Sequence, residues 1–442
     1  MTVRYFSLFF WLCLLGSSTL LANHHHHRRA APAKPTRVAH RYHFTSPLYG
    51  QNALTQILNR LIQPNSRSAK IAVYVKSMRH GDILYAHSIY QSLAPASTLK
   101  ILTAEAALLY LGPNYRFNTQ LLTDSGTITN GVLQGNLYVV LSGDPTFTDD
   151  NLLELLSALR SKSIHAIAGN IYIDRTAYDQ EFYGPGWKVR DKQYCYAAPI
   201  SASIINRNCP SFYSKMGMGS VVNNISEYNR LLLRNAFKTL AITVYGNILF
   251  APAPATLFSI NNHYSEPLTV LINNMLKKSD NIIAGAIFKK IGQRYTQKPG
   301  SWERGSLAVS QILKDQSHVH TNGVKILDGS GLSPENQATP SQMMEALDFA
   351  YHHALLHDTL LTSLPISGVD GTLKHRMYPI AHKVRAKTGT IAGVVALAGF
   401  VESKNKEPLA FVIMINGYKG GNTRYKTLED QIAMALTRYQ RT

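Results

Sequence analysis

The chain has 442 residues, too many for one compact core, and a usual domain size of about 150 residues indicates two or three domains. Its apolar fraction of 45% is that of an ordinary globular protein. The formal net charge of +19 favours contact with acidic polymers or membrane surfaces. No recognised nucleic-acid-binding motif accompanies this charge, so we expect no nucleic acid partner.

The only long apolar run lies at the N-terminus, from Tyr5 to Ala22, between Arg4 and a polar, basic segment. This order is typical of a secretory signal peptide, which we predict at residues 1–22. An uncleaved N-terminal anchor is the alternative. Both interpretations place the bulk of the protein outside the cytoplasm, and we expect a periplasmic location. Peptidoglycan or an anionic membrane surface then suits the basic charge better than nucleic acid does.

Residues 23–47 contain Pro32, Pro35 and many basic side chains without periodicity, and we interpret them as a disordered linker. Within it, the run His24 to His27 is typical of a solvated tail, and a weak metal-binding role is the less favoured interpretation. We expect no metal and no cofactor elsewhere in the chain.

The first structured segment begins with helical apolar spacing from Leu54 to Ile62. Lys70 to Met78 and Ile83 to Tyr90 then read as two strands around a polar turn, which predicts a hairpin. A stretch rich in Ala and Leu follows from Ser97 to Leu111 and ends at Gly112. That stretch predicts a buried helix that begins at Ser97.

The middle of the chain has a different pattern. Leu137 to Leu141 and Ile171 to Asp174 predict strands, with a helix at Leu152 to Leu159 between them and several tight turns around them. We interpret residues 120–260 as an inserted domain.

Two cysteines remain after export, because Cys13 would leave with the signal peptide. Cys195 and Cys209 form an even pair in an oxidising compartment and could bridge. Two buried free thiols are the alternative, and the sequence does not decide between them.

The last part of the chain returns to long regular elements. A helical pattern runs from Leu268 to Ile291, and the final hundred residues predict three strands and a closing helix, at Lys383 to Ile391, Val394 to Val401, Leu409 to Ile415 and Leu428 to Tyr439. Strands at both ends of the chain with helices between them indicate one antiparallel sheet assembled from the two termini.

Three short motifs occur in order along these elements: Ser97-Thr98-Leu99-Lys100, Ser279-Asp280-Asn281 and Lys387-Thr388-Gly389-Thr390. Residues three apart lie on one face of a helix, so the Lys100 amine can reach the Ser97 hydroxyl. A serine is a poor nucleophile without such a partner. A lysine acts as a base only when neutral, and burial together with a second cation favours that state. Lys387 is the candidate for the second cation.

Beyond these motifs, the sequence resembles the penicillin-binding D-Ala-D-Ala carboxypeptidases and endopeptidases of the DacB type, from about residue 50 to residue 440. Further segments carry the resemblance, among them Leu111-Gly112-Pro113, Ser142-Gly143-Asp144-Pro145, Cys195-Tyr196-Ala197-Ala198-Pro199, Asp328-Gly329-Ser330-Gly331-Leu332-Ser333, Leu364-Pro365-Ile366 and Gly368-Val369-Asp370-Gly371-Thr372-Leu373.

The resemblance implies an α/β (α+β) fold of the β-lactamase/transpeptidase type, with an antiparallel five-stranded sheet flanked by helices and a smaller inserted domain. The peptidase domain would comprise residues 48–119 and 261–442, and the insertion residues 120–260. Family members of this type carry a long insertion, usually built as two extra domains. The interval between Ser97 and Ser279 is short for that, so we expect a reduced insertion that lacks the third domain.

The resemblance also implies the catalytic residues. Ser97 would attack the substrate carbonyl while Lys100 takes its proton. Ser279 and Asn281 would lie across the cleft to relay a proton to the leaving amine and to hold the substrate amide. Lys387 completes the set.

Substrate binding falls to the third motif. Lys387 and Thr388 suit the terminal carboxylate of the substrate, and Gly389 and Thr390 extend the same strand edge. The backbone N–H groups of Ser97 and Thr390 would form the oxyanion hole. Asp174 is a further candidate, for pairing with the free amine of a diaminopimelate side chain, although an aspartate after a strand is more often a turn former.

The resemblance therefore implies a serine-type D-Ala-D-Ala carboxypeptidase and DD-endopeptidase, with peptidoglycan stem peptides as substrates and β-lactam antibiotics as ligands. A β-lactamase-like hydrolase and a catalytically silent wall-binding protein of the same fold are the alternatives. The sequence does not determine the oligomeric state.

Overall fold

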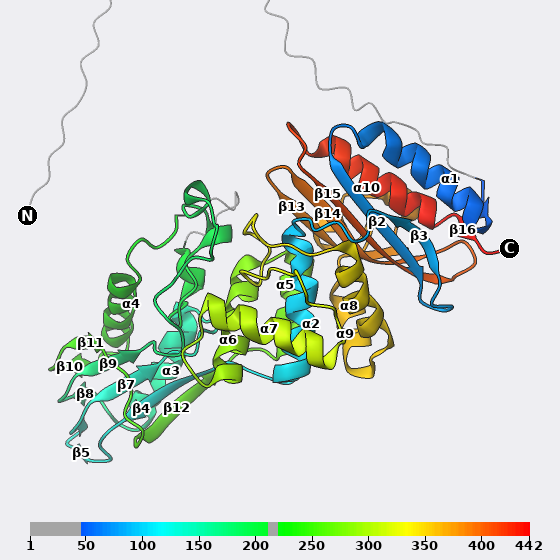
Figure 1. Cartoon of the computed structure of the whole chain (residues 1–442). Helices are drawn as coiled ribbons and strands as arrows, with labels where there is room; N and C mark the ends of the chain where they lie inside the picture. Colours follow the sequence, from blue (N-terminus) through cyan, green and yellow to red (C-terminus); the bar gives the residue numbers. More distant parts are fainter. Residues whose placement is uncertain (1–45, 211–219) are drawn as a thin grey trace, which may run out of the picture. The chain divides into compact units, whose positions relative to one another are not determined.

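The computed structural model describes residues 46–210 and 220–442 (Figure 1). The predicted signal peptide, the histidine run and nearly all of the predicted linker lie outside the described residues. Within the described part of the chain, no helix has the length and apolar character needed to span a lipid bilayer.

A five-stranded antiparallel sheet is assembled from both ends of the chain, as predicted. The hairpin near the N-terminus pairs with the three C-terminal strands in the order β13-β14-β15-β2-β3. The strands are β2 (Lys70–Ser77), β3 (Ile83–His87), β13 (Val384–Ile391), β14 (Val394–Glu402) and β15 (Pro408–Asn416). Along β15 and β2 the register pairs Val412 with Tyr74 and Ile413 with Val73.

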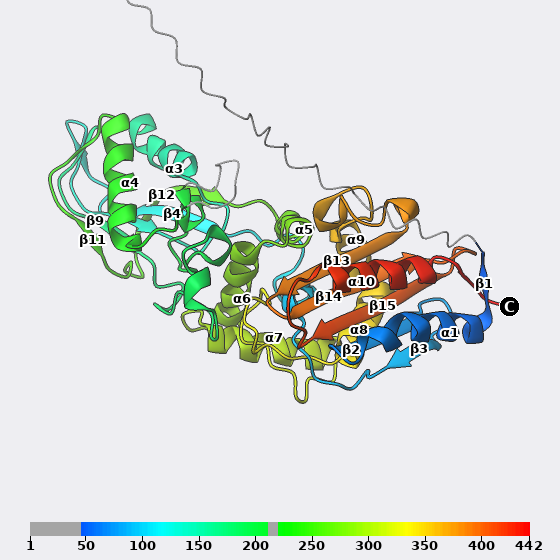
Figure 2. The ribbon, with the colours of Figure 1, turned by 90° about the horizontal axis from the view of Figure 1, so that it is seen from above.

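Alternation along these strands divides the apolar residues between two cores. Val73 and Ile413 belong to one cluster, and their neighbours Tyr74 and Val412 belong to the other. Both faces of the sheet are therefore covered, because successive side chains of a strand point to opposite faces. The face that carries Val73 and Ile413 is covered by α1 (Gly50–Ile62) and α10 (Thr423–Leu436), which lie side by side on it in Figure 2.

The opposite face, which carries Tyr74 and Val412, packs against a larger group of helices. These helices surround the buried helix α2. These helices are α2 (Lys100–Leu111), α5 (Leu268–Lys278), α6 (Asn281–Thr296), α7 (Trp302–Gln316), α8 (Pro340–His352) and α9 (Ala354–Ser363). Helix α2 is buried on nearly all sides, consistent with its Ala-rich and Leu-rich sequence. The helical pattern predicted from Leu268 to Ile291 is interrupted at Ser279 and Asp280, which separate α5 from α6.

The predicted closing helix is wrong at its C-terminal end. Helix α10 ends at Leu436, and the next residues form β16 (Tyr439–Gln440), which pairs in parallel with β1 (Leu48–Tyr49). Tyr439 is buried because it continues the apolar cluster beneath α1, and helical periodicity alone does not distinguish such a residue from one more helical turn.

Residues between α2 and α5 form two further sheets. One has the order β11-β9-β7-β4-β12 and the other the order β10-β8-β6-β5. Their strands are β4 (Asn118–Thr123), β5 (Ile128–Thr129), β6 (Val132–Leu133), β7 (Leu137–Val140), β8 (Ala166–Ile167), β9 (Ile171–Asp174), β10 (Thr243–Val244), β11 (Ile248–Phe250) and β12 (Phe258–Tyr264). The helices α3 (Asp149–Ser161) and α4 (Ile225–Thr239) complete a separate apolar cluster with them. The division of the chain into an inserted domain and a peptidase domain stays a prediction.

Candidate active site

The segment that carries Ser97 is a tight turn that leads into α2. Residues Ala96–Leu99 form a short 3₁₀ helix and Lys100 is the first residue of α2. A 3₁₀ helix has three residues per turn, so Lys100 projects directly above Ser97. Ala96 has a φ of 46°, in the left-handed region that a non-glycine residue occupies only when its surroundings enforce it. The predicted helix therefore exists, with Ser97 in the turn that precedes it.

Three oxygens surround the amine of Lys100, whose side chain is fully buried. Its Nζ lies 3.0 Å from Ser97 Oγ, 2.7 Å from Asn281 Oδ1 and 2.6 Å from the backbone oxygen of Ser330. The last two oxygens can only accept hydrogen bonds, whereas the hydroxyl can also donate. A neutral amine has two N–H groups and one lone pair, so donating to both carbonyl oxygens leaves its lone pair directed at Ser97.

Burial favours this neutral state. It lowers the pKa of Lys100 to about 7, against the opposing negative charges of Asp328 and Asp280. Burial also lowers the pKa of Lys387 well below its ordinary value, and the nearby amine of Lys100 lowers it further. Both lysines are thus desolvated, and for Lys387 burial lowers the pKa more than repulsion by Lys100 does.

The turn that carries Ser97 forms the first wall of the site, and the junction of α5 and α6 forms the second. Ser279 adopts the left-handed conformation with φ 57° and ψ 41°, which ends α5. Asp280 then caps α6 by accepting from the backbone N–H groups of Ile282 and Ile283 and pairs with Arg207 at 2.6 Å. The middle residue of the motif therefore has a structural role, which leaves Ser279 and Asn281 on its two sides to face the site.

Strand β13 forms the third wall. Lys387 Nζ donates to Ser279 Oγ at 2.9 Å and to the backbone oxygen of Thr388 at 2.8 Å. At Gly389 the strand comes so close to the Ser97 turn that a Cβ atom would lie 3.1 Å from the Ser97 backbone nitrogen and 3.0 Å from Ala96 Cβ. Glycine is needed there because any side chain would separate the strand from the nucleophile.

These walls enclose a pocket of about 400 Å³, here called the Ser97 pocket. It is lined by Ser97, Lys188, Arg190, Asp191, Tyr196, Ser279, Asn281, Leu332, Pro334, Thr390, Ile391 and Ala392. The structure thus brings Ser97, Ser279, Asn281 and Thr390 together around one cavity. Lys100 and Lys387 are fully buried and do not line the cavity. The hydroxyl of Thr388 donates a hydrogen bond to Thr372 Oγ1 at 2.7 Å.

Asp174, predicted to pair with a substrate amine, does not line the Ser97 pocket. It lines a different cavity of about 570 Å³ together with residues of β7 and α6. Its Oδ1 accepts from the backbone N–H and the hydroxyl of Thr176, and its Oδ2 accepts from the backbone N–H of Ala253. The carboxylate therefore holds the turn after β9, as aspartates at strand ends commonly do.

An acid that was not predicted as a site residue, Asp191, borders the Ser97 pocket. Among the described residues that line the Ser97 pocket it is the only carboxylate, and its Oδ1 accepts from the hydroxyl of Tyr196 at 3.0 Å. Tyr196 in turn offers its backbone oxygen to Asn281 Nδ2 at 2.9 Å. The one sequence signal for this residue is its place four positions before the segment that begins at Cys195.

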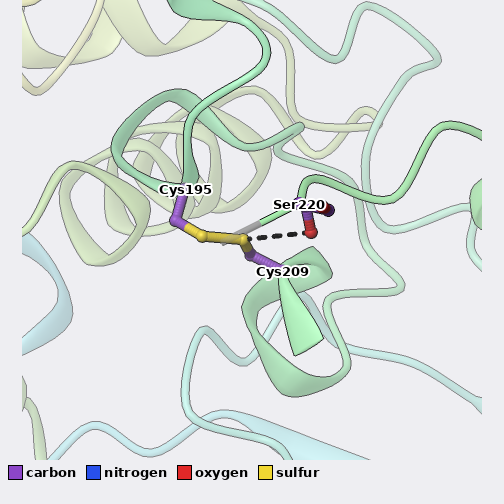
Figure 3. The surroundings of a disulfide bond; sticks show 3 residues. All are labelled: Cys195, Cys209 and Ser220. Carbon is purple, nitrogen blue, oxygen red and sulfur yellow. Dashed lines mark hydrogen bonds between the residues drawn. A yellow bond between two sulfur atoms is a disulfide. The ribbon is translucent and has the colours of Figure 1, made fainter. Parts of the chain in front are cut away.

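A disulfide anchors this wall of the pocket. Cys195 and Cys209 are bonded, with their Cα atoms 5.6 Å apart, so the bridge left open by the sequence is present (Figure 3). The Cys209 sulfur lies 3.3 Å from the backbone oxygen of Ser220, the third residue drawn in Figure 3. Because Tyr196 directly follows Cys195, the bridge fixes the segment that carries Asp191 and Tyr196.

A buried carboxylate supports the carbonyl that holds Lys100. Asp328 is fully buried, and its Oδ1 accepts from the backbone N–H groups of Ser330 and Gly331, both at 2.7 Å. Its Oδ2 accepts from Ser333 N and from the indole of Trp187 at 2.8 Å each. These bonds fold the loop so that the Ser330 oxygen points at the amine. Asp328 is a positioning residue that sequence reasoning did not single out.

No group of three His, Cys, Asp or Glu residues with the arrangement of a metal site occurs in residues 46–210 and 220–442. The Ser97 pocket brings the hydroxyls of Ser97 and Ser279 to the edge of β13, with the desolvated amine of Lys100 behind Ser97. Together they can perform nucleophilic attack on a carbonyl with proton transfer to the amine.

Comparison with known proteins agrees with this geometry. Residues 53–213 and 209–439 match the D-Ala-D-Ala carboxypeptidase 3 (S13) family. The chain belongs to this family. A relative named D-alanyl-D-alanine carboxypeptidase DacB, from Haemophilus influenzae, is 30% identical over 434 residues, which cover 83% of this chain and 89% of the relative.

Solved structures support the same family membership. The crystal structure of penicillin binding protein 4 (dacB) from H. influenzae has a TM-score of 0.80 and 29% identity, and the match covers 86% of this chain and 99% of that one. The same protein complexed with a β-lactam has a TM-score of 0.75 and 28% identity, covering 85% of this chain and 98% of that one. The predicted β-lactamase/transpeptidase-like fold with a five-stranded antiparallel sheet is confirmed.

Proposed function

We propose that this protein is a serine-type D-Ala-D-Ala carboxypeptidase that forms an acyl-enzyme on Ser97. The observation that carries the proposal is the buried, desolvated amine of Lys100, whose Nζ lies 3.0 Å from the Ser97 hydroxyl. The family is defined by this activity, and its H. influenzae member is named for it.

In the acylation step, Ser97 Oγ attacks the carbonyl of the penultimate D-alanine while its proton moves to Lys100 Nζ. The negative charge that develops on the carbonyl oxygen is met by the backbone N–H groups of Ser97 and Thr390, which border the same cavity. The peptide bond then breaks, the terminal D-alanine leaves, and the acyl group stays on Ser97. Water completes the cycle by hydrolysing this ester.

The leaving amine needs a proton, and the pair Ser279–Lys387 can supply it. Ser279 Oγ lies 2.9 Å from Lys387 Nζ and also lines the pocket, so it connects the buried amine to the leaving group. The substrate carboxylate adds negative charge near Lys387, which raises the pKa of this lysine and makes it a cation when substrate is bound. Thr388 and Thr390 offer hydroxyl groups to the same carboxylate.

At the other end of the pocket, we assign the recognition of the free amine of a diaminopimelate side chain to Asp191 in place of Asp174. Asp191 is the single acid on the described pocket wall, and Tyr196 holds its carboxylate in position. If the leaving amine belongs to a neighbouring stem peptide, the same steps cut a cross-link, which is the DD-endopeptidase activity. Export by the N-terminal segment to the periplasm, where peptidoglycan lies, is part of this proposal, as is contact of the basic chain with an anionic membrane surface.

The test is mass spectrometry of the intact protein after incubation with benzylpenicillin. The parent protein gains one acyl group, located on Ser97 by peptide mapping, and Ser97→Ala gains none. Ser92→Ala, which removes an exposed hydroxyl outside the pocket, gains the same adduct as the parent. An unmodified parent protein refutes the proposal and favours a silent wall-binding protein.

The lifetime of the adduct distinguishes a peptidase from a β-lactamase. A peptidase of this type keeps the penicilloyl group for minutes, whereas a β-lactamase releases it rapidly and turns over added penicillin. Hydrolysis of a D-Ala-D-Ala peptide by the parent, absent in Ser97→Ala, completes the assignment.

A further inference from the structure

A second cavity, the one that contains Asp174, is strongly basic. We call it the Lys290 pocket; it has a volume of about 570 Å³, within the usual range for ligand sites. It lies between the ends of β7 and β9 and the C-terminal half of α6. Its lining residues include four cations and one acid, namely Arg116, Lys290, Arg294, Lys298 and Asp174.

Lys290 is the unusual member of this group, because its side chain is only 5% exposed. Its Nζ donates to Gln293 Oε1 at 2.5 Å and lies over the rings of Phe117 and Tyr178, at 5.5 and 5.4 Å from their centroids. None of these neighbours carries a negative charge, and no ion pair of Lys290 is found in the described part of the chain. Burying an ammonium group without an anion is costly. The adjacent Lys289 shows the usual solution, an ion pair with Asp179 at 2.7 Å.

The one acid in the Lys290 pocket, Asp174, supplies a single negative charge against four basic side chains and forms no ion pair with Lys290. Both oxygens of Asp174 already accept hydrogen bonds from Thr176 and Ala253. The C-terminus of α6 contributes a partial negative charge of about one half, which offsets only part of the charge of one nearby cation. Arg294 and Lys298 are exposed and have no acidic partner in the described residues, so a net positive charge remains.

We propose that the Lys290 pocket binds an oxyanion, a carboxylate or a phosphate, whose charge compensates Lys290 and Arg294. The volume exceeds what a single small ion fills, which favours an anion carried on a larger molecule. Burial lowers the pKa of Lys290 to about 7, and a bound anion restores the cationic form of this amine.

The placement of the pocket suggests the source of the anion. Lys290 and Asn281 lie on one helix, nine residues apart, which corresponds to roughly 14 Å along the axis. A stem peptide held in the Ser97 pocket belongs to a polymer with further peptide carboxylates at such distances. We therefore assign the Lys290 pocket to a carboxylate of an acidic stem peptide; this assignment of the source rests on the proposed function.

The experiment is isothermal titration of the purified chain after Ser97 has been acylated with benzylpenicillin, so that the Ser97 pocket is blocked. The two probes are inorganic phosphate and an acidic stem tripeptide that lacks D-Ala-D-Ala. We expect one molecule of tripeptide to bind, and the dissociation constant to rise at least tenfold in Lys290→Met and in Arg294→Gln. Arg294 is exposed, so its variant keeps the fold even where the buried substitution does not. Lys314→Met removes an exposed lysine of α7 and is the matched control, with unchanged binding.

Binding of neither phosphate nor the tripeptide, or binding that both pocket variants leave unchanged, overturns the proposal. Binding of phosphate without the tripeptide supports the oxyanion site and overturns the stem peptide as its source. Failure of benzylpenicillin to acylate Ser97 counts against the proposed function alone, because titration of the untreated chain still tests the pocket.

Discussion

Two regions of the molecule bury lysine side chains, and they differ in what surrounds the amine. On α6, Lys289 is fully buried but pairs with Asp179, and this carboxylate opposes the lowering of its pKa by burial. At the Ser97 pocket, Lys100 is equally buried, and its hydrogen-bonding partners are a hydroxyl and two carbonyl oxygens. A buried amine with an adjacent carboxylate stabilises structure as an ion pair, whereas one held by neutral oxygens can exchange a proton at neutral pH.

The largest effect is expected from replacing the base itself. Lys100→Met should slow acylation by benzylpenicillin by about 1,000-fold or more, because the neutral amine that takes the proton is lost. Lys100→Arg should be equally slow, since a guanidinium stays protonated. Stopped-flow acylation rates measure both, with the exposed Lys162→Met as control. An active Lys100→Arg would show that the cation, and not the base, matters.

Glu105 extends the comparison of buried charged groups, because it is a buried acid with no ion pair among the described residues. Glu105 on α2 is 1% exposed, neither carboxylate oxygen has a clear hydrogen-bond partner in the described residues, and burial raises its pKa to about 8, weakly opposed by the nearby Ser317 hydroxyl. Between pH 4.5 and 8 the folded chain keeps this proton and the unfolded chain has released it. Stability should therefore fall as pH rises through this window, by up to about 1.4 kcal/mol for each pH unit.

Glu105→Gln should remove this slope and raise the melting temperature at pH 8 relative to the parent. Thermal unfolding at pH 5, 6, 7 and 8 measures the effect. Glu154→Gln, at an exposed position of α3, should keep the parental slope. Parallel slopes for the parent and Glu105→Gln would mean that Glu105 is ionised in the folded chain.

The next largest effect is expected from removing the disulfide between Cys195 and Cys209. Replacing Cys195 and Cys209 together with Ala opens a loop of about 15 residues, for which the loss of chain entropy in the unfolded state corresponds to about 3 kcal/mol. Urea unfolding measures this difference, and acylation should also slow because the wall with Asp191 and Tyr196 is no longer anchored. Reduction of the parent should reproduce the stability loss; a double variant as stable as the oxidised parent contradicts the prediction.

The smallest effect is expected from replacing Asp328, whose carboxylate positions the Ser330 carbonyl that accepts from Lys100. In the parent, acylation should increase with pH and level off above about 7, because Lys100 must lose its proton. Asp328 raises the pKa of Lys100, so Asp328→Asn should move this midpoint to lower pH and slow acylation about 10- to 100-fold through loss of the Ser330 contact. The pH profile is the decisive readout, since a purely structural defect lowers the rate without moving the midpoint.

Much of the fold could be predicted because its signals are local. The hairpin of β2 and β3, the three C-terminal strands and the helix after Ser97 follow from alternation and helical spacing within short windows. The strands at both ends of the chain indicated the antiparallel sheet, and the family resemblance indicated its five strands and the residues of the three walls. The end of the last helix was misplaced, because Tyr439 satisfies an apolar position in β16 as well as it would in α10.

What the sequence by itself determined is therefore the strands of the five-stranded sheet, the helix after Ser97 and the three motifs that meet at Ser97. Only the tertiary structure decided which acid borders that pocket, because Asp174 ends β9 and Asp191 ends a short 3₁₀ helix, and the placement of both depends on contacts between distant segments. It also decided that Lys100 lacks a carboxylate partner and that Lys290 lies buried in a basic cavity. Burial and charge balance are sums over neighbours from the whole fold, and no local pattern of residues contains them.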